Sequence, residues 1–168
     1  MRIALGITGC IASYKAAEIV RQLRKEEAEV DVIMTENSTY FISPLTFQSL
    51  SGKRVILNQY QLHPDASIEH ISLARKIDLF LIAPASANIL NKFASGVADD
   101  FLSTFFLSAS SPILIAPSMN SSMYLNPVVQ GSIEKLKMMG VTFIDPEEGE
   151  LACGEEGIGR LASIDSIV

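Results

Sequence analysis

Strand-like apolar runs alternate with helix-like segments along the whole chain, and this alternation constrains the fold more than any other feature. The strand-like runs lie at 2–8, 29–35, 78–83, 113–116 and 141–144. The helix-like segments lie at 13–25, in part of 37–50, and at 87–94, 100–108 and 127–139, while 55–62 is ambiguous. The sequence therefore predicts an α/β fold with a doubly wound parallel sheet in three layers, Rossmann-like or flavodoxin-like.

Length and charge narrow the class of protein. The 168 residues suit a single domain with a full core, and no linker or repeat divides them. The net charge of −6, from 13 basic and 19 acidic residues, argues against nucleic acid and anionic membranes as partners. Apolar runs are too short to span a bilayer, and glycines interrupt the first run too early for a signal peptide. Two cysteines make no disulfide framework, so a reducing cytoplasm is expected.

The segment 117–124, Pro-Ser-Met-Asn-Ser-Ser-Met-Tyr, follows the strand at 113–116 and precedes an Asn-Pro pair that predicts a helix start. It is expected to be a strand-to-helix loop at the carboxyl end of a parallel strand, where open α/β sheets bind ligands. Asn120 can donate to a carboxylate, and Met119 and Met123 can pack against a flat ring. The alternative is a helix-entry loop with two core methionines.

The segment 8–15, Thr-Gly-Cys-Ile-Ala-Ser-Tyr-Lys, joins the first strand to the first helix. Gly9 lets backbone N–H groups approach a phosphate at the helix N-terminus, and Thr8 and Ser13 add hydroxyl groups. The turn has one glycine, because Cys10 and the isoleucine after it break the dinucleotide pattern, so a mononucleotide phosphate fits better. The alternative is the tight turn that any such fold needs.

A third strand end, at 83–88, reads Ala-Pro-Ala-Ser-Ala-Asn and shares its Ala-Pro and following Asn with the segment at 116–120. Small residues let a planar ring lie against the backbone, although Ser86 can also serve simply as a helix cap. At the end of the second strand, Thr35 and Ser38 are candidate hydroxyl groups for a ribityl chain or a phosphate.

The two histidines differ in context. His70 can act as a base or pair with an anion, although a satisfied structural role is the commoner one for a lone histidine. His63, between Leu62 and Pro64, is expected to be an exposed turn residue. Neither has a neighbouring ligand pattern, so no metal site is predicted.

The segment 150–161 combines three glycines with Cys153 and Arg160. Such glycine density predicts a flexible lid, and an arginine beside a thiol suits a clamp over an anionic substrate. The alternative is a mobile tail with an inert cysteine.

Together these segments resemble the homo-oligomeric flavin-containing cysteine decarboxylases, and among them the phosphopantothenoylcysteine decarboxylases of coenzyme A biosynthesis. The similarity covers nearly the whole chain, and its most specific parts are Pro-x-Met-Asn-x-x-Met at 117–123 and the clamp at 152–161. The others are the flavin loop at 6–15, the histidine segment at 70–73 and the flavin segments at 83–88 and 96–100. Tyr124 stands where tryptophan is usual, and Cys10 where a small residue is common.

The resemblance implies an FMN enzyme that converts 4'-phosphopantothenoylcysteine to 4'-phosphopantetheine, as a trimer or dodecamer with its sites at the trimer contact. The catalytic candidates are His70, Asn120 and Cys153. The cofactor-binding candidates are Thr8, Gly9, Cys10, Ser13, Thr35, Ser38, Ser86, Ala87, Asn88 and Met119. The substrate-binding candidates are Asn120, Met123, Ala152, Gly154 and Arg160. A single domain over 1–168 would carry them all.

Chemistry gives these roles a reason. A cysteine carboxylate has no adjacent electron sink, so oxidation of the thiol-bearing carbon to a thioaldehyde by a flavin must come first. Loss of carbon dioxide then gives an enethiol, and the resemblance implies its reduction to the saturated thiol. His70 would serve the oxidative half as base or electrostatic partner, Cys153 would donate the proton in the reductive half, and Asn120 would hold the substrate carboxylate.

Two other functions remain open at this stage. A peptidyl-cysteine decarboxylase of the lantibiotic type stops at the enethiol and should not need Cys153 or the clamp. A flavoprotein regulatory subunit of a phosphatase would bind without turnover, but the acidic tails expected there are absent. A flavin prenyltransferase is disfavoured because it lacks the Met-Asn loop.

Overall fold

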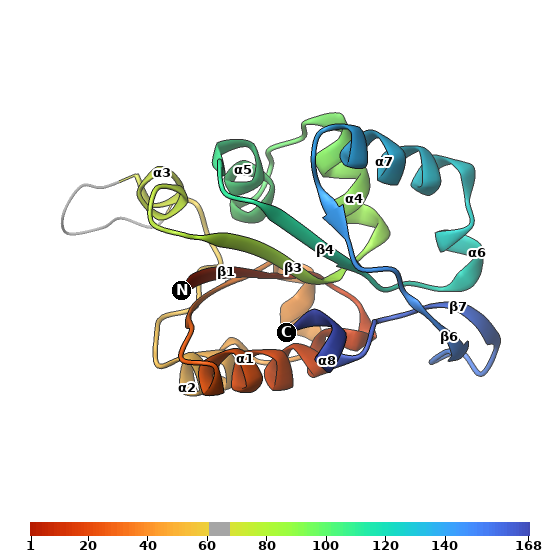
Figure 1. Ribbon diagram of the computed structural model, residues 1–168, viewed down its shortest axis with the longest axis horizontal. Coiled ribbons are helices and arrows are strands. Elements are labelled where there is room, and N and C mark those ends of the chain that lie inside the picture. The colour runs from red at the N-terminus through yellow and green to blue at the C-terminus, as the bar shows by residue number, and fades with distance from the viewer. Residues whose placement is uncertain (61–67) are drawn as a thin grey trace.

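The computed structural model describes residues 1–60 and 68–168, so His63 and the end of the ambiguous 55–62 segment lie outside the described residues. Its centre is a parallel sheet in the order β2-β1-β3-β4-β5 (Figure 1). The strands are β1 (Arg2–Ile7), β2 (Glu29–Met34), β3 (Leu79–Ala85), β4 (Ile113–Pro117) and β5 (Thr142–Phe143). The predicted doubly wound parallel sheet is confirmed.

Helices cover both faces of the sheet (Figure 1). One face carries α1 (Ala16–Lys25), α2 (Pro44–Ser51) and α8 (Ile164–Ile167), and the other carries α3 (Glu69–Ala74), α4 (Ala87–Ser95), α5 (Phe101–Ser108) and α7 (Pro127–Met138). Because successive strand residues point to opposite faces, Phe80 and Ile82 join one apolar core while Leu81 and Ala83 join the other. Both faces of β3 are buried, as its continuous apolar run predicts.

Several short elements escape the sequence pattern. The 13–25 helix begins as the 3₁₀ helix η1 (Ile11–Lys15), and a second 3₁₀ helix, η2 (Glu36–Tyr40), precedes α2. The short helix α6 (Ser121–Tyr124) lies in a segment that was expected to be a loop, and no element was predicted at α3, because one or two turns are too short to show a periodic pattern. Ile56 forms an isolated parallel bridge with Ile33.

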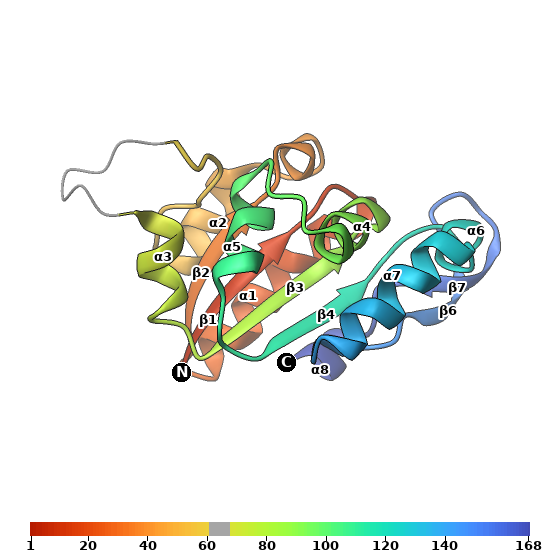
Figure 2. The same cartoon turned by 90° about the horizontal axis from the view of Figure 1, so that it is seen from above.

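The segment 150–161, predicted as a flexible lid, forms the turn and second strand of an antiparallel hairpin made by β6 (Glu147–Glu150) and β7 (Glu156–Arg160). It lies beside α6, beyond the end of β4, while α3 lies at the opposite end of the molecule (Figure 2). Its glycines have a geometric cause: Gly159 has φ +139°, and a Cβ there would meet the Met119 carbonyl oxygen. Glycine density here reflects close backbone approach as well as turn formation.

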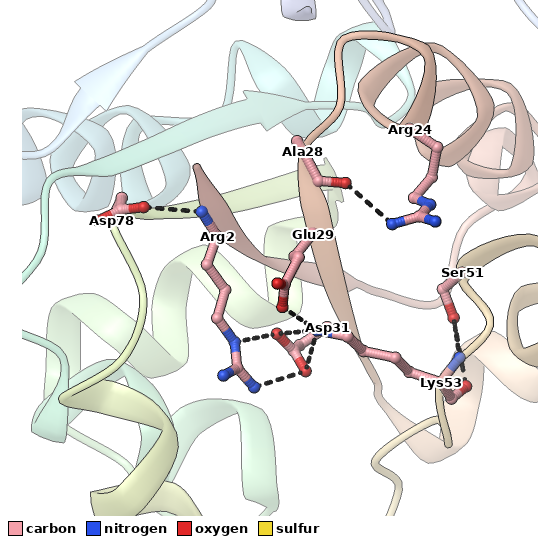
Figure 3. Close-up of polar contacts among 8 residues, drawn as sticks. All are labelled: Arg2, Arg24, Ala28, Glu29, Asp31, Ser51, Lys53 and Asp78. Atoms are coloured by element: carbon pink, nitrogen blue, oxygen red, sulfur yellow. Dashed lines mark hydrogen bonds and ion pairs between the residues drawn. The ribbon is translucent and has the colours of Figure 1, made fainter.

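A cluster of ion pairs and hydrogen bonds joins β1, β2 and the start of β3 near their amino ends (Figure 3). Arg2 donates through Nε and Nη2 to the two carboxylate oxygens of Asp31 at 2.7 and 3.1 Å. Lys53 Nζ lies 3.2 Å from Asp31 and 3.0 Å from Glu29, and the Arg2 backbone N–H donates to Asp78 at 2.7 Å. The two-pronged contact between Arg2 and Asp31 has the geometry of the stronger charge-assisted hydrogen bonds.

Within residues 1–60 and 68–168, none of the helices is both long and apolar enough to cross a membrane.

Candidate functional site

A cavity of about 890 Å³ opens at the carboxyl ends of β1, β3 and β4 and is closed on one side by the β6–β7 hairpin. In the sheet, β1 has β2 on one side and β3 on the other, so the strand order reverses direction at β1. The cavity therefore lies at the topological switch point, where open α/β sheets bind ligands. The predicted site residues that line it are Thr8, Gly9, Cys10, Thr35, Ser86, Ala87, Asn88, Met119, Asn120, Met123, Ala152, Cys153 and Arg160.

Four predicted residues do not line this cavity. Ser13 and Ser38 are fully buried, and their hydroxyl groups donate to backbone carbonyls of the turns that contain them. Gly154 lies in the hairpin loop, where its N–H donates to the Leu151 carbonyl at 2.9 Å. His70 lies on α3, where its ring meets the edge of Phe101 with the centroids 6.3 Å apart. Within one chain, therefore, His70 does not line the cavity.

The floor of the cavity is fixed by Thr8. Its buried hydroxyl donates to the Pro84 carbonyl and accepts from the Ser86 N–H, both at 2.8 Å. Ser86 in turn caps α4 by accepting from the Ile89 N–H. The first and third strand ends are thus joined by side-chain hydrogen bonds.

Asn120 has a defined orientation because it caps α6. Its side-chain oxygen accepts from the Ser122 N–H at 2.8 Å, so the amide nitrogen must face the other way. That nitrogen lies 3.6 Å from the Cys153 Sγ and 3.3 Å from a carboxylate oxygen of Glu155. The amide is held as a donor toward the exposed tip of the hairpin.

Two hydrogen bonds fix the hairpin to the loop that holds Asn120. The Met119 N–H donates to the Gly159 carbonyl at 3.0 Å, and the Ser121 hydroxyl donates to the Ile158 carbonyl at 2.5 Å. The sequence placed Asn120 and Cys153 in separate motifs, and these contacts bring them together.

The two cysteines have different surroundings. Burial raises the pKa of the Cys10 thiol, although hydrogen bonds near Ala12 and Ser118 oppose this effect. Cys10 therefore behaves as a half-buried packing residue of the first loop. Cys153 is exposed at the hairpin tip and is the accessible thiol.

Three charged residues of the cavity wall, Lys92, Asp99 and Asp100, were not among the predicted site residues, although the two aspartates belong to the predicted flavin segment at 96–100. Lys92 Nζ lies 2.6 Å from Asp99 and 3.0 Å from Asp100. Burial of Asp100 opposes its ionisation, but hydrogen bonds from Ser103 and Lys92 together hold its pKa below the ordinary value. Glu155 does not line the cavity but contacts Asn120 and Cys153, and it was also absent from the predictions, although it follows Cys153 by only two positions. The sequence does show a carboxylate two positions after a candidate proton donor, and this proximity could have identified Glu155 as a site residue.

Comparison with known proteins places these features in a family. The flavoprotein family model matches residues 1–168. The chain belongs to the flavoprotein family. This flavoprotein is 43% identical to a "Probable phosphopantothenoylcysteine decarboxylase" of Streptococcus mutans, over 99% of the chain and 94% of that protein.

Two further proteins are similar to this flavoprotein. The "Coenzyme A biosynthesis bifunctional protein CoaBC" of Bacillus subtilis is 45% identical over 99% of the chain, which spans only 41% of that relative's length. A solved PPC decarboxylase mutant complexed with pantothenoylaminoethenethiol superposes with a TM-score of 0.86 at 30% identity, covering 98% of this chain and 92% of that one.

The residues of the cavity fit a flavin. Thr35 Oγ1 is buried at the cavity wall and has no hydrogen-bond partner among the described residues, so it is available to a ligand hydroxyl or phosphate. Gly9 leaves no room for a side chain, since a Cβ there would lie 2.6 Å from the Asn37 Cβ. Apolar Ile11, Met119 and Leu161 line the same space and can face a ring. No group of three metal-ligating side chains occurs in the part of the chain that the structure describes.

Proposed function

We propose that this flavoprotein decarboxylates 4'-phosphopantothenoylcysteine to 4'-phosphopantetheine. The observation that carries the proposal is the 3.6 Å approach of the Asn120 amide to the Cys153 thiol inside the strand-end cavity. A carboxylate-binding donor and a proton donor thus lie side by side, which a decarboxylation completed by protonation requires. The similarity to proteins named for this activity supports the same substrate.

Each residue has a role that follows from its position. Asn120, oriented by its cap, donates its amide N–H to the substrate carboxylate. Cys153, exposed at the hairpin tip, donates a proton to the carbon skeleton after carbon dioxide has left. Arg160 lines the cavity and attracts the anionic substrate, while Met119 and Met123 shape the apolar part. His70 serves the oxidative half as base or electrostatic partner.

The cofactor in this proposal is FMN, which supplies the two-electron redox chemistry that the cysteine carbon needs. The single-glycine first loop favours a mononucleotide over a dinucleotide. Thr8, Gly9, Cys10, Thr35, Ser86, Ala87, Asn88 and Met119 would hold it, while Ser13 and Ser38 would support the loops behind them. Purified protein should be yellow, and a colourless protein that takes up no flavin on reconstitution would exclude this cofactor.

The proposal includes an oligomer, a trimer or a multiple of three. One subunit places His70 on α3, at the end of the molecule opposite α6 and the hairpin (Figure 2). A neighbouring α3 can supply the histidine that a single subunit does not bring to the cavity. Ile11 and Tyr14 line the cavity and yet are 54% and 58% exposed, which leaves an apolar rim for a neighbour to cover. The reducing cytoplasm remains the expected location.

The deciding experiment is a comparison of substrates. Native protein loaded with FMN is given 4'-phosphopantothenoylcysteine or a cysteine-ended peptide, and carbon dioxide and product masses are measured. We expect turnover of the first to the saturated thiol. Turnover of the peptide alone, ending at the enethiol, would instead make the protein a peptidyl-cysteine decarboxylase. In a parallel pull-down, the protein is used to capture a phosphatase. A captured phosphatase, together with no turnover of either compound, would support the regulatory alternative.

A further inference from the structure

Glu155 lies in contact with both partners of the proposed decarboxylation site. Its Oε2 accepts from the Asn120 amide at 3.3 Å and lies 3.7 Å from the Cys153 Sγ, within reach of the thiol proton. Asn120 and Cys153 are themselves 3.6 Å apart, so the three groups form a closed triangle. Asn120 precedes Cys153 by 33 positions and Glu155 by 35, and the docked hairpin brings it together with them.

The carboxylate of Glu155 has the chemistry of the group that Asn120 is proposed to bind. An oriented amide has two N–H donors, and its oxygen is already used by the α6 cap. A substrate carboxylate that enters would approach the same donor and would be repelled by a carboxylate already there. The two carboxylates therefore compete for one position.

We infer that Glu155 is an internal stand-in for the substrate carboxylate, occupying the Asn120 amide in the ligand-free protein and leaving it when substrate enters. The inference rests on the proposed function for the identity of the incoming ligand. Before binding, Glu155 satisfies the amide and holds it close to the thiol. Binding then exchanges one carboxylate for another, so Glu155 acts as a positioning residue that also lowers the affinity of the site for ligands carrying a carboxylate.

The contact can be tested without substrate or flavin, through the alkylation of Cys153. Iodoacetate carries a carboxylate and iodoacetamide does not, so their rate ratio at one thiol cancels changes in that thiol's own reactivity. Glu155→Gln should raise the iodoacetate-to-iodoacetamide ratio at Cys153 about fivefold at low ionic strength, the effect of one unit charge near 4 Å in water. Peptide mass spectrometry separates Cys153 from Cys10.

Glu156→Gln is the matched control, since it removes the same charge from the adjacent exposed position, which pairs in register with Glu150. Its ratio should stay close to the native one. Glu155→Ala, which removes both charge and hydrogen bonding, should shift the ratio in the same direction as Glu155→Gln. Equal ratios for the native protein and both Glu155 variants would overturn the inference.

A ligand experiment tests the exchange itself. Calorimetry compares 4'-phosphopantothenoylserine, which keeps the carboxylate but lacks the thiol, with its decarboxylated counterpart. Glu155→Gln should bind the serine compound about fivefold more tightly and the decarboxylated one unchanged. Weaker or unchanged binding of the serine compound would overturn the inference. If neither compound binds the native protein, the proposed function fails, whereas the alkylation ratio still decides the Glu155 contact.

Discussion

The backbone N–H of Met119 donates to the carbonyl of Gly159 at 3.0 Å, and this contact joins the loop that holds Asn120 to the hairpin that holds Cys153. Neither side chain alone makes a decarboxylation site. Because the hairpin is fixed to the loop by backbone atoms, the amide and the thiol share one rigid frame.

Gly159→Ala should break this frame. A Cβ at Gly159 would lie 2.1 Å from the Met119 carbonyl oxygen, so the hairpin must move away. We expect a loss of decarboxylation of about 100-fold, as for a misplaced catalytic group, with the sheet still folded. Gly140→Ala is the control, because Gly140 also has a positive φ but meets nothing within 4 Å. Equal activity of the two variants would show that the close approach is unimportant.

Cys153→Ser should separate the two halves of the reaction. Serine keeps the size of the side chain but is a far weaker acid than a thiol, whose free pKa is about 8.5. The variant should release carbon dioxide once and then stall, with an enethiol product lighter by two hydrogens than 4'-phosphopantetheine. Single-turnover mass spectrometry measures this. Saturated thiol formed at the native rate would mean that Cys153 is not the proton donor.

Mixed oligomers should show whether neighbouring subunits share a site. His70→Asn and Asn120→Ala should each be inactive alone, since one lacks the histidine and the other the carboxylate donor. When the two are unfolded together and reassembled in equal amounts, about a quarter of native activity should return, because each site combines residues from two subunits chosen at random. No recovery would place both residues in one subunit's site.

Asp100 should contribute stability that depends on pH. Its folded pKa is depressed, so its stabilising charge is fully present above the unfolded value near 3.9 and is lost as the pH falls through the lower folded value. Asp100→Asn keeps a helix-capping side chain but loses the charge beside Lys92. The variant should be less stable than the native protein by about 0.5 kcal/mol at pH 7, the size of a partly exposed ion pair. Urea titrations should show this difference shrinking as the pH falls below about 3.9, and a difference independent of pH would contradict the assignment.

The strand ends could be predicted because their signals are local. An apolar run followed by Gly9, or by an Ala-Pro pair as at Ala83, marks both the strand and the loop after it, and parallel pairing then places these loops together. The cavity position and most of its lining follow from that alone. Asn120 could also be predicted from the sequence as a site residue. Only the orientation of its amide depends on the tertiary structure, through its role as the cap of α6.

The remaining features depend on tertiary contacts that leave no periodic signal. The absence of His70 from the cavity wall follows from where α3 packs on the sheet, and the role of Glu155 follows from how the hairpin docks. Ser13 and Ser38 were attractive as hydroxyl donors, but their turns use those hydroxyl groups internally. A sequence shows which donors exist, whereas the fold decides which are free.

The double hydrogen bond of the Thr8 hydroxyl has a consequence for how the protein acquires its cofactor. These two hydrogen bonds join the carboxyl ends of β1 and β3 through atoms of the chain itself. The floor of the cavity is therefore formed when the protein folds. A ligand that enters a pre-shaped floor loses little free energy to the ordering of loops. Flavin analogues should therefore be exchangeable into the emptied protein without a refolding step, which makes the site suitable for cofactor substitution.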